Sequence, residues 1–418
     1  MGDFESSFLE ETELNQGMSN DILDADHIHR YPAKMTPKIA NYVLKNACNE
    51  FDKEPDKIQV FDPFCGSGTT LLVARSYGFS VSGVDILRVP VLIAKAKLTK
   101  LNNQNLKRLQ TALDLDAEDI QTFNGLDSWE NRDIWFKDEV YGYLMSLRDW
   151  INTYQNKYVY PALFTALSQV VWDVSAADSG VIVPTRSKRS PVAPDFSQEE
   201  ILEKFKKRVE KILLAQKIFS NSKFPNPNVK LSTGDSKNNS SWPIDNFDLV
   251  ITSPPYGDGI NYRRAVSLQT RFFGLENEDD GEFIRKTIIG RASYHHDISE
   301  KTLPNKEKKS RWVTSIRSRS EKRLESILSY VQDIRLTFRE LREKINPQGK
   351  AIFVIGHPEV SGIKVPLSRV LVNIAEEEEW QLAETPICDS IKNRVQTPIR
   401  RSSTNPISEE YILQFRCS

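Results

Sequence analysis

The stretch Ile58-Gln59-Val60-Phe61-Asp62-Pro63-Phe64-Cys65-Gly66-Ser67-Gly68-Thr69-Thr70 decides the fold class of this chain. Its first four residues are mostly apolar and run into the turn residues Asp62 and Pro63, which predicts a buried strand. A loop of small residues follows, and the apolar run from Thr69 to Tyr77, ended by Gly78, predicts a helix. The order of strand, glycine loop and helix is typical of the first unit of a doubly wound α/β sheet.

Strands and helices alternate in this way over two parts of the chain. After the first unit, residues 81–84 predict a second strand that ends on Asp85, and apolar residues recur with the helical period from Pro90 to Leu101. A long helix is predicted from Glu321 to Ile345. The other strand-like segments lie in the second half of the chain, at residues 229–232, 247–251, 351–355, 380–387 and 410–415. We therefore expect a mostly parallel sheet with helices on both faces.

Residues 106–225 interrupt this alternation. Their pattern predicts mostly helices, rich in Trp and Tyr, and includes a charged helix from Ser197 to about Phe219. Residues 1–25 are acidic and lack a firm period, so we expect a mobile arm or a surface strap there. The predicted organisation is an N-terminal arm (1–25), an α/β domain made of 26–105 and 226–418, and a helical insertion (106–225).

The composition excludes several classes of protein. The chain has 418 residues, of which 39% are hydrophobic and 27% charged, with a formal net charge of −1; these fractions argue against wholesale disorder. No apolar run approaches the roughly 18 residues of a membrane span, and the acidic start does not resemble a secretion signal. The four cysteines are far apart and form no CxxC pair, so we expect a reduced, cytoplasmic protein without disulfides. His295-His296-Asp297 has no supporting ligand spacing, so no metal site is expected.

The glycine loop predicts a nucleoside-binding site. Glycines allow a ligand to approach the backbone closely, and the helix that follows presents free N–H groups. The loop has no GxxxxGK[ST] pattern and lacks the third glycine of a dinucleotide-binding fingerprint. Asp85 ends the next strand about 20 residues downstream, where a carboxylate can accept both ribose hydroxyls. We therefore expect a nucleoside ligand without a pyrophosphate.

A second informative segment is Ser253-Pro254-Pro255-Tyr256, which follows the strand predicted at 247–251. Two prolines hold the backbone extended and lack N–H donors, so the carbonyls there can only accept hydrogen bonds. Such a segment suits a planar group that carries an NH₂: the amine would donate to the Ser253 side chain and the Pro254 carbonyl, and Tyr256 would stack on the ring. A proline-rich surface turn is the alternative, but the position after a strand and downstream of Asp85 favours a site.

Together these motifs resemble the DNA amino-methyltransferases, which transfer a methyl group from S-adenosylmethionine to an exocyclic base nitrogen. Asp62 to Thr69 is similar to the family's cofactor loop, and Thr252 to Tyr256 to its catalytic motif. His29-Arg30-Tyr31-Pro32-Ala33-Lys34 resembles the upstream motif that closes over the methionine end of the cofactor, with Met35 where the family usually has Phe. The segment 257–274 is also similar, and the resemblance covers about residues 27–105 and 226–418.

The resemblance implies a class I methyltransferase fold, with a mostly parallel seven-stranded sheet whose last strand is antiparallel. It also implies S-adenosylmethionine as the cofactor, with Asp62 near the methionine amine, Asp85 on the ribose and Asp235 on the adenine amine. The implied cofactor-binding residues are Tyr31, Pro32, Ala33, Lys34, Asp62, Pro63, Phe64, Cys65, Gly66, Ser67, Gly68, Thr69, Asp85 and Asp235. The implied catalytic residues are Ser253, Pro254, Pro255 and Tyr256.

The residue before the two prolines bears on the target base. In this family SPPY more often accompanies methylation of cytosine N4, whereas Asp or Asn in the first position more often accompanies adenine N6, so we expect cytosine N4 first and adenine N6 second. The lone pair of such an amine is delocalised into the ring, and two acceptors would free it to attack the sulfonium methyl in line. A carbon-5 mechanism needs a cysteine nucleophile, typically beside proline. The chain has no Pro-Cys dipeptide, and we interpret Cys65 as a turn residue.

A base inside a duplex cannot reach such a pocket, so we expect the enzyme to flip its target out of double-stranded DNA. Flipping requires phosphate contacts around the site, and the basic candidates come from the insertion and from the segment after the catalytic motif. They are Arg186, Lys188 and Arg189, and Lys308, Lys309, Arg311, Arg317 and Arg319. The insertion is the candidate target-recognition region. A cognate restriction endonuclease or another defence component is the further partner that the resemblance suggests.

Two other functions stay open on the sequence. Some tRNA guanine-N2 methyltransferases share a glycine loop and a PPY-type motif, although they usually carry Asp before the prolines and an appended RNA-binding module. The other is a catalytically silent DNA-binding relative, against which the intact loop, Asp85 and the Ser253–Tyr256 motif argue.

Overall fold

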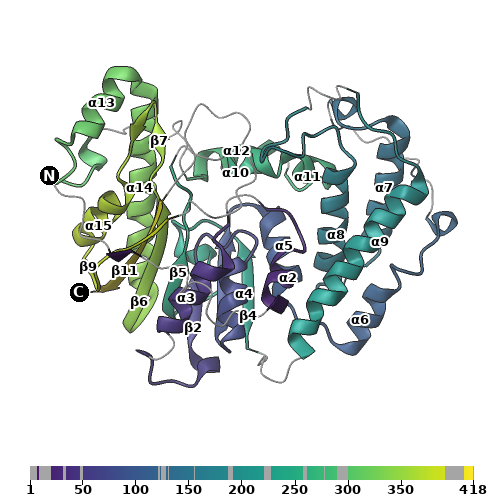
Figure 1. The fold of residues 1–418 in the computed structure, drawn as a ribbon, viewed down its shortest axis with the longest axis horizontal. Coiled ribbons are helices and arrows are strands. Elements are labelled where there is room, and N and C mark those ends of the chain that lie inside the picture. The colour runs from purple at the N-terminus through teal and green to yellow at the C-terminus, as the bar shows by residue number, and fades with distance from the viewer. Residues whose placement is uncertain are drawn as a thin grey trace.

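The computed structural model (Figure 1) describes residues 7–8, 20–31, 34–47, 50–120, 123, 129, 131–154, 156–186, 192–220, 227–257, 261–276, 278–289, 300–390 and 409–417. A central sheet crosses the molecule, and helices cover both of its faces.

The sheet is mostly parallel and its last strand is antiparallel, as the sequence predicts for a class I methyltransferase fold. Its seven main strands lie side by side as β4-β3-β2-β5-β6-β11-β10. All neighbouring pairs from β4 to β6 are parallel, whereas β11 runs antiparallel to both β6 and β10. The bounds are β2 Gln59–Asp62, β3 Ser80–Asp85, β4 Val229–Thr233, β5 Phe247–Thr252, β6 Ile345–Gly356, β10 Ile387–Ser390 and β11 Glu409–Cys417. The fold prediction is confirmed, including the antiparallel last strand.

Two short strands extend this sheet beyond the seven that we predicted. β1 (Ser7–Phe8) pairs parallel with β10, and β9 (Trp380–Leu382) pairs antiparallel with β11. The described residues therefore form a nine-stranded sheet, together with a separate hairpin of β7 (Glu359–Val360) and β8 (Ile363–Lys364). β1 has only two residues, too few for a pattern in the sequence. The segment predicted as one strand at 380–387 contains β9 and the first residue of β10, so it forms two strands rather than one.

Successive buried residues of the strands face different helical layers. Val60 belongs to the apolar core shared with α3 (Pro37–Ala47), α4 (Thr69–Ser76) and α5 (Arg88–Leu98). Its neighbour Phe61 belongs to the core on the other face, which is shared with α13 (Arg311–Arg319), α14 (Glu321–Lys344) and α15 (Leu367–Glu377). The central strands are thus buried on both faces, which is why their sequences read as continuous apolar runs.

The insertion forms a helical bundle beside α5. Its helices are α6 (Asn103–Gln110), α7 (Asp138–Asn152), α8 (Tyr160–Asp173) and α9 (Gln198–Ala215), and α8 packs directly on α5. Figure 1 shows this bundle at the opposite side of the molecule from α13 and α14. Aromatic residues form much of its core; Tyr141, for example, is buried and meets Phe272 edge-on at 6.1 Å.

The remaining helices lie before β2 and after β5. α2 (Asn20–Asp26) belongs to the region predicted as an N-terminal arm, and its Ile22 and Ala25 side chains are buried in the core. α10 (Tyr262–Ala265), α11 (Ser267–Phe272) and α12 (Glu278–Thr287) follow β5. Among the helices described, none is long and apolar enough to cross a membrane.

Candidate active site

The loop after β2 forms one wall of a pocket at the carboxyl ends of the parallel strands. Gly66 and Gly68 have φ angles of 49° and 80°, in the left-handed region that favours glycine. A Cβ atom added at Gly68 would lie 2.9 Å from the Ala94 Cβ on α5, and one at Gly66 would lie 3.2 Å from Tyr31 Cε1. The loop can therefore turn this tightly between α5 and Tyr31 only with glycine at both positions.

Two carboxylates end the neighbouring strands β2 and β3. Asp62 accepts the Thr252 hydroxyl at 2.6 Å, and Asp85 accepts the Gly66 N–H at 3.1 Å. Each carboxylate also accepts the N–H of the second residue after it, at 3.0 and 2.8 Å. Burial outweighs these bonds and raises the pKa of Asp62 to about 7 and that of Asp85 to about 6. Both side chains therefore exchange protons close to neutral pH.

Asp235 follows β4 and is fixed by a lysine. It accepts the Lys237 N–H at 3.0 Å, and the Lys237 ammonium lies 3.6 Å from it. The same ammonium lies 3.4 Å from Asp333 on α14 and donates to the carbonyl of Thr287 at the end of α12. Burial raises the pKa of Asp235, and the Lys237 charge opposes that rise. Lys237 thus holds Asp235 beside the end of α12.

The Ser253–Tyr256 segment leaves β5 at the same edge of the sheet. Ser253 and Pro255 line the pocket, and Ser253 Oγ lies 2.8 Å from the Tyr256 hydroxyl oxygen. That hydroxyl donates to a carboxylate oxygen of Glu410 at 3.0 Å. Pro254 is buried, and the Tyr256 ring packs against the apolar core on the α14 face. Tyr256, whose ring we expected to stack on the target, is not among the residues that line the pocket in this structure, although its hydroxyl is bonded to Ser253, which is.

These segments surround one pocket at the carboxyl ends of the parallel strands. The pocket brings together most of the residues predicted for cofactor binding and catalysis. Its lining includes Tyr31, Lys34, Asp62, Pro63, Phe64, Cys65, Gly66, Ser67, Thr69, Asp85, Asp235, Ser253 and Pro255. Gly68 supports the loop from behind, whereas Pro32 and Ala33 lie outside the described residues.

Several lining residues were not predicted: Thr70, Ile86, Leu87, Ser236, Tyr262, Thr287, Ile288 and Ile289. Ile86, Leu87 and Ser236 directly follow the predicted strand-end acids, so extending each motif by one or two residues would have found them. Thr287 to Ile289 come from the end of α12 and carry no local sequence signal. They reach the pocket through the packing of a segment that starts more than twenty residues after Tyr256.

A buried ion cluster that we did not predict lies under the glycine loop. The Asp26 carboxylate on α2 is bonded to the ammonium of Lys97 on α5 at 2.8 Å, to the Lys34 ammonium, and to the Thr69 hydroxyl at 2.6 Å. Lys97 also donates to Ser67 Oγ at 3.3 Å. The side chains of Asp26 and Lys97 are 0% exposed. Burial alone would raise the pKa of Asp26, but the two ammonium groups hold it well below its usual value.

The helical insertion holds the segment that contains Tyr31. The Arg30 guanidinium donates to the carbonyls of Ser179 at 2.8 Å and Val181 at 2.6 Å, and it lies 4.9 Å from the centre of the Trp172 ring. The neighbouring His29 ring shares a hydrogen bond of 2.9 Å with Ser168 on α8. The insertion therefore anchors the segment that contributes Tyr31 to the pocket lining.

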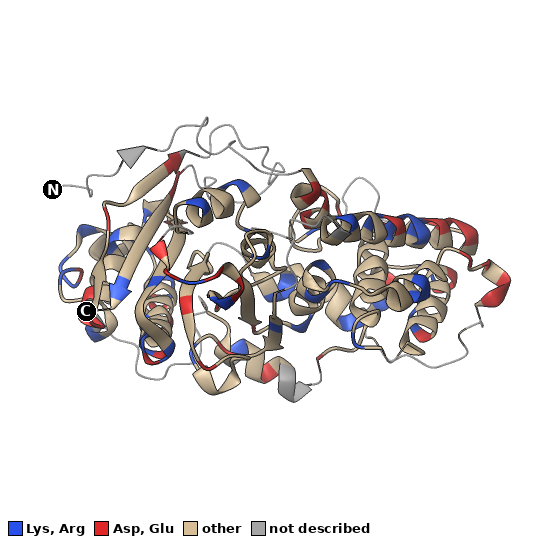
Figure 2. Cartoon of the chain, turned by 90° about the horizontal axis from the view of Figure 1, so that it is seen from below, with Lys and Arg blue, Asp and Glu red and all other residues tan. Residues whose placement is uncertain are grey.

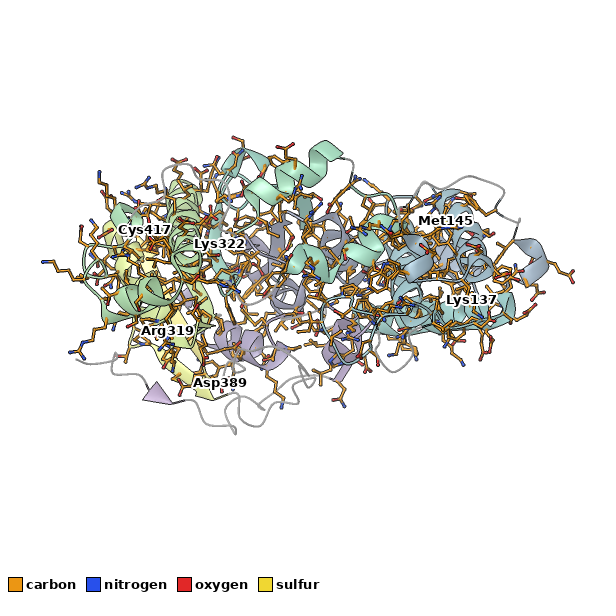
Figure 3. All side chains as sticks on the ribbon, turned by 90° about the horizontal axis from the view of Figure 1, so that it is seen from above. Lys137, Met145, Arg319, Lys322, Asp389 and Cys417 are labelled. Carbon is orange, nitrogen blue, oxygen red and sulfur yellow. The ribbon has the colours of Figure 1, made fainter. Side chains whose placement is uncertain are left out.

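The predicted DNA-contact residues lie outside the pocket lining. Arg317 and Arg319 are exposed near the end of α13, and Arg319 donates to the Ser361 carbonyl at 2.7 Å. Figure 1 places α13 at the left end of the molecule, whereas α10 and α12 lie near the middle of its upper edge. In Figure 3, Arg319 and Lys322 lie on the opposite side of the molecule from Lys137 and Met145 of the insertion.

The other predicted basic residues take different positions. Lys309 and Arg311 are exposed, and Lys308 donates to Asn305 at 2.7 Å. Arg186 pairs with Ala177 in a single antiparallel bridge, whereas Lys188 and Arg189 lie outside the described residues. Figure 2 shows basic and acidic residues interspersed along the described elements of the chain.

Cysteine and metal chemistry add little to the site. Cys65 is buried, and burial raises the pKa of its thiol, which disfavours the nucleophilic thiolate. Among the described residues, no group of three or more His, Cys, Asp and Glu side chains is arranged to hold a metal ion. The segment with His295 and His296 lies outside those residues.

Comparison with known proteins identifies relatives that are named methyltransferases. Type II methyltransferase M.MvaI of Kocuria varians is 23% identical over 363 residues, covering 82% of this chain and 79% of that protein. Type II methyltransferase M.BsoBI of Geobacillus stearothermophilus is 24% identical over 377 residues, covering 76% and 72%. Type II methyltransferase M.MjaII of Methanocaldococcus jannaschii is 39% identical over 82 residues, which are 20% of this chain and 14% of that protein.

No protein-family model matches the chain. Among solved structures, the rRNA methyltransferase aviRa from Streptomyces viridochromogenes aligns with a TM-score of 0.36 and 10% identity, over 98% of this chain and 96% of that chain.

Proposed function

We propose that this chain is a site-specific DNA methyltransferase that transfers a methyl group from S-adenosylmethionine to an exocyclic amine, with cytosine N4 as the first candidate and adenine N6 as the second. The observation that carries the proposal is the single pocket that contains both the Gly66 loop with Asp85 and the residues Ser253 and Pro255. The names of the three relatives, all Type II methyltransferases, support the same reaction and DNA as the substrate.

The residues of the pocket fit the proposed cofactor. Asp85 presents a carboxylate that can accept ribose hydroxyls, because backbone N–H groups hold it in place without neutralising it. Asp62 supplies a second carboxylate for an ammonium group, and Asp235 supplies one for an aromatic amine. Added Cβ atoms at Gly66 and Gly68 would press on Tyr31 and α5, so the glycines preserve the narrow loop. When bound, S-adenosylmethionine supplies an electrophilic methyl group on a sulfonium.

The chain would activate the target amine by position and by hydrogen bonding. Ser253 Oγ lies in the pocket wall, and Pro254 and Pro255 add no N–H donors beside it. Acceptors at this place bind the two amine hydrogens and favour a tetrahedral nitrogen, whose lone pair is then free to attack. Because the amine nitrogen itself attacks the methyl group, the reaction needs no cysteine nucleophile and no strong dedicated base. We extend the proposal to a target base flipped out of the duplex, and to a cytoplasmic enzyme that acts beside a cognate nuclease.

The pKa values of the pocket acids predict how cofactor binding depends on pH. Ionised Asp62 attracts a cationic ligand, and protonation near pH 7 removes that attraction. Affinity for S-adenosylmethionine should therefore fall as the pH is lowered, by about tenfold between pH 8 and pH 6 for a group that titrates at pH 7. Isothermal titration calorimetry across this range measures the change, with Asp62→Asn as the control that should leave only the smaller fall expected from Asp85, whose pKa is raised to about 6. An affinity of the wild type that is constant from pH 6 to pH 8 would contradict the assignment.

The α13 arginines should bind DNA without reading its sequence. Replacing Arg317 and Arg319 by alanine should weaken binding to all duplexes alike and lower the slope of log K against log salt by about one for each lost phosphate contact. Lys57→Ala is the control, because Lys57 is an exposed lysine just before β2, outside both α13 and the insertion, and it pairs with Asp56. Fluorescence anisotropy at several salt concentrations measures both quantities. An unchanged slope in the double variant would remove α13 from the DNA-binding surface.

The experiment that tests the proposed function is modification-sensitive sequencing of DNA from cells that express the chain, beside cells that express Tyr256→Ala. We expect N4-methylcytosine at one sequence motif, lost with the variant. N6-methyladenine at one motif would make adenine the target. DNA without modification would contradict the proposal and direct attention to RNA.

A further inference from the structure

A chain of hydrogen bonds runs from the pocket wall to a carboxylate on the last strand. Ser253 Oγ and the Tyr256 hydroxyl oxygen lie 2.8 Å apart, and the Tyr256 hydroxyl lies 3.0 Å from Glu410 Oε1. Glu410 stands near the start of β11, where its Cα pairs with that of Gly356 on β6. It is therefore part of the sheet and occupies a fixed place relative to β5, which carries Ser253.

The direction of these bonds follows from the donors that are present. A tyrosine hydroxyl has one hydrogen, and an ionised carboxylate can only accept. Tyr256 therefore donates its hydrogen to Glu410 and has only lone pairs left for Ser253. The bond between Ser253 and Tyr256 must then run from the serine to the tyrosine. In this arrangement the Ser253 hydrogen points away from the pocket, and the lone pairs of its oxygen remain available.

The surroundings keep Tyr256 protonated, as this direction requires. Burial, together with the nearby charge of Glu410, raises the pKa of the Tyr256 hydroxyl well above its usual value. The tyrosine consequently keeps its single hydrogen at neutral pH.

We propose that Glu410 is a positioning residue that makes Ser253 an acceptor-only group, by orienting the Tyr256 hydroxyl so that the serine hydroxyl must donate to it. The inference rests on the proposed function, in which the target amine donates to Ser253. A serine can either donate or accept, whereas an amine that must lose its conjugation needs acceptors alone. The chain Ser253–Tyr256–Glu410 resolves this ambiguity and gives a neutral serine the hydrogen-bonding character of a carboxylate.

The test measures methyl transfer to unmethylated amplified genomic DNA by wild type, Glu410→Ala, Glu410→Gln and Tyr256→Phe. Glu410→Ala should lower kcat by about tenfold. The variant no longer orients the Ser253 hydroxyl but keeps its oxygen, so the loss should be smaller than the 10²-fold or more expected when a stabilising partner is deleted outright. Tyr256→Phe should lose about as much, while Glu410→Gln, whose amide oxygen still accepts from Tyr256, should stay within about threefold of wild type. The affinity for S-adenosylmethionine in the absence of DNA should be the same in all four proteins.

A double variant separates positioning from a merely structural role. Once Tyr256→Phe has removed the link, adding Glu410→Ala should cost nothing further in kcat, whereas independent structural effects would add. Glu409→Ala is the matched control, since Glu409 is the adjacent strand carboxylate and pairs with Lys364 at 3.0 Å. It should retain the wild-type rate.

The outcomes keep this inference apart from the proposed function. A wild type that transfers no methyl group to DNA would overturn the proposed function. An active wild type with Glu410→Ala and Tyr256→Phe both within twofold of its kcat would overturn the role of Glu410 alone. If Glu410→Ala does not fold, Tyr256→Phe decides: a tenfold lower kcat supports the chain of bonds, and full activity overturns it.

Discussion

Replacing Ser253 by alanine should abolish most methyl transfer while leaving cofactor binding intact. Ser253 lines the pocket. In the proposed mechanism its oxygen is the side-chain acceptor for the target amine, and its loss removes an interaction that strengthens as the nitrogen becomes tetrahedral. Removing one preorganised hydrogen-bond partner of a developing charge lowers kcat by about 10²- to 10³-fold. Single-turnover transfer of a labelled methyl group to DNA measures the loss, and calorimetry measures the affinity for S-adenosylmethionine.

Ser232→Ala provides the matched control for that substitution. Ser232 is a partly buried serine on β4, donates to the Ser241 carbonyl at 3.1 Å and is not among the residues that line the pocket. Its variant should transfer methyl groups at the wild-type rate. If Ser253→Ala also kept that rate, the target amine would have to be bound elsewhere, and the catalytic role assigned to the Ser253–Tyr256 motif would be wrong.

The second large effect is expected on stability, from Asp26→Ala. This change leaves the fully buried Lys97 ammonium without its carboxylate, only 3.3 Å from the Ser67 hydroxyl. Breaking a buried ion pair by removing one partner costs about 3–5 kcal/mol, because an uncompensated charge stays in the interior. The free energy of unfolding from urea titration, followed by tryptophan fluorescence, should fall by that amount.

Two further variants isolate the buried charge as the cause. Asp24→Ala removes an exposed carboxylate from the same helix and should change stability by less than about 0.5 kcal/mol. Lys97→Met removes the buried ammonium and leaves Asp26 paired with Lys34 and Thr69, so it should cost less than Asp26→Ala. A loss below 1 kcal/mol in Asp26→Ala would show that the cluster is not a main support of the glycine loop.

The sequence predicted the parts of the site whose signals are local. The glycine loop and the Ser253–Tyr256 segment each combine a strand, a turn and a few functional residues within a dozen positions. Because parallel strands bring their carboxyl ends to one edge of a sheet, predicting the strands also predicted that these segments meet there. Gly66, Asp85 and Ser253 line the same pocket, as this reasoning predicts.

The residues that the sequence did not reveal act through contacts between distant positions. Asp26 lies 71 positions from Lys97, and Glu410 lies 154 from Tyr256, so no periodicity links either pair. No sequence pattern marks Lys97 as buried, and its pairing with Asp26 of α2 appears only in the folded chain. Arg30 belongs to a recognised motif, yet its partners Ser179 and Val181 lie in the insertion, which no motif covered.

The boundary between α14 and β6 shows a similar limit at short range. Pro347 and Gly349 are residues that end helices, and the helix does end just before them, at Lys344. The strand nevertheless begins at once, because Ile345 pairs with Phe247, and the pairing resumes only at Lys350 with Leu249. Gln348, with a φ angle of 66°, lies within the irregularity between these pairs. Pro347 and Gly349 predicted that the helix ends close to them. They did not predict that β6 begins at Ile345, before the irregular residues.

The central claim is that one pocket binds S-adenosylmethionine and delivers its methyl group to a DNA amine. The most direct measurement incubates the purified chain with S-adenosylmethionine labelled in the methyl group and with unmethylated DNA, digests the DNA to nucleosides and identifies the labelled product by mass spectrometry. We predict label on the exocyclic nitrogen of cytosine, dependent on both Asp85 and Ser253. Label on cytosine carbon 5, or no label in DNA from a chain that binds the cofactor, would contradict the claim.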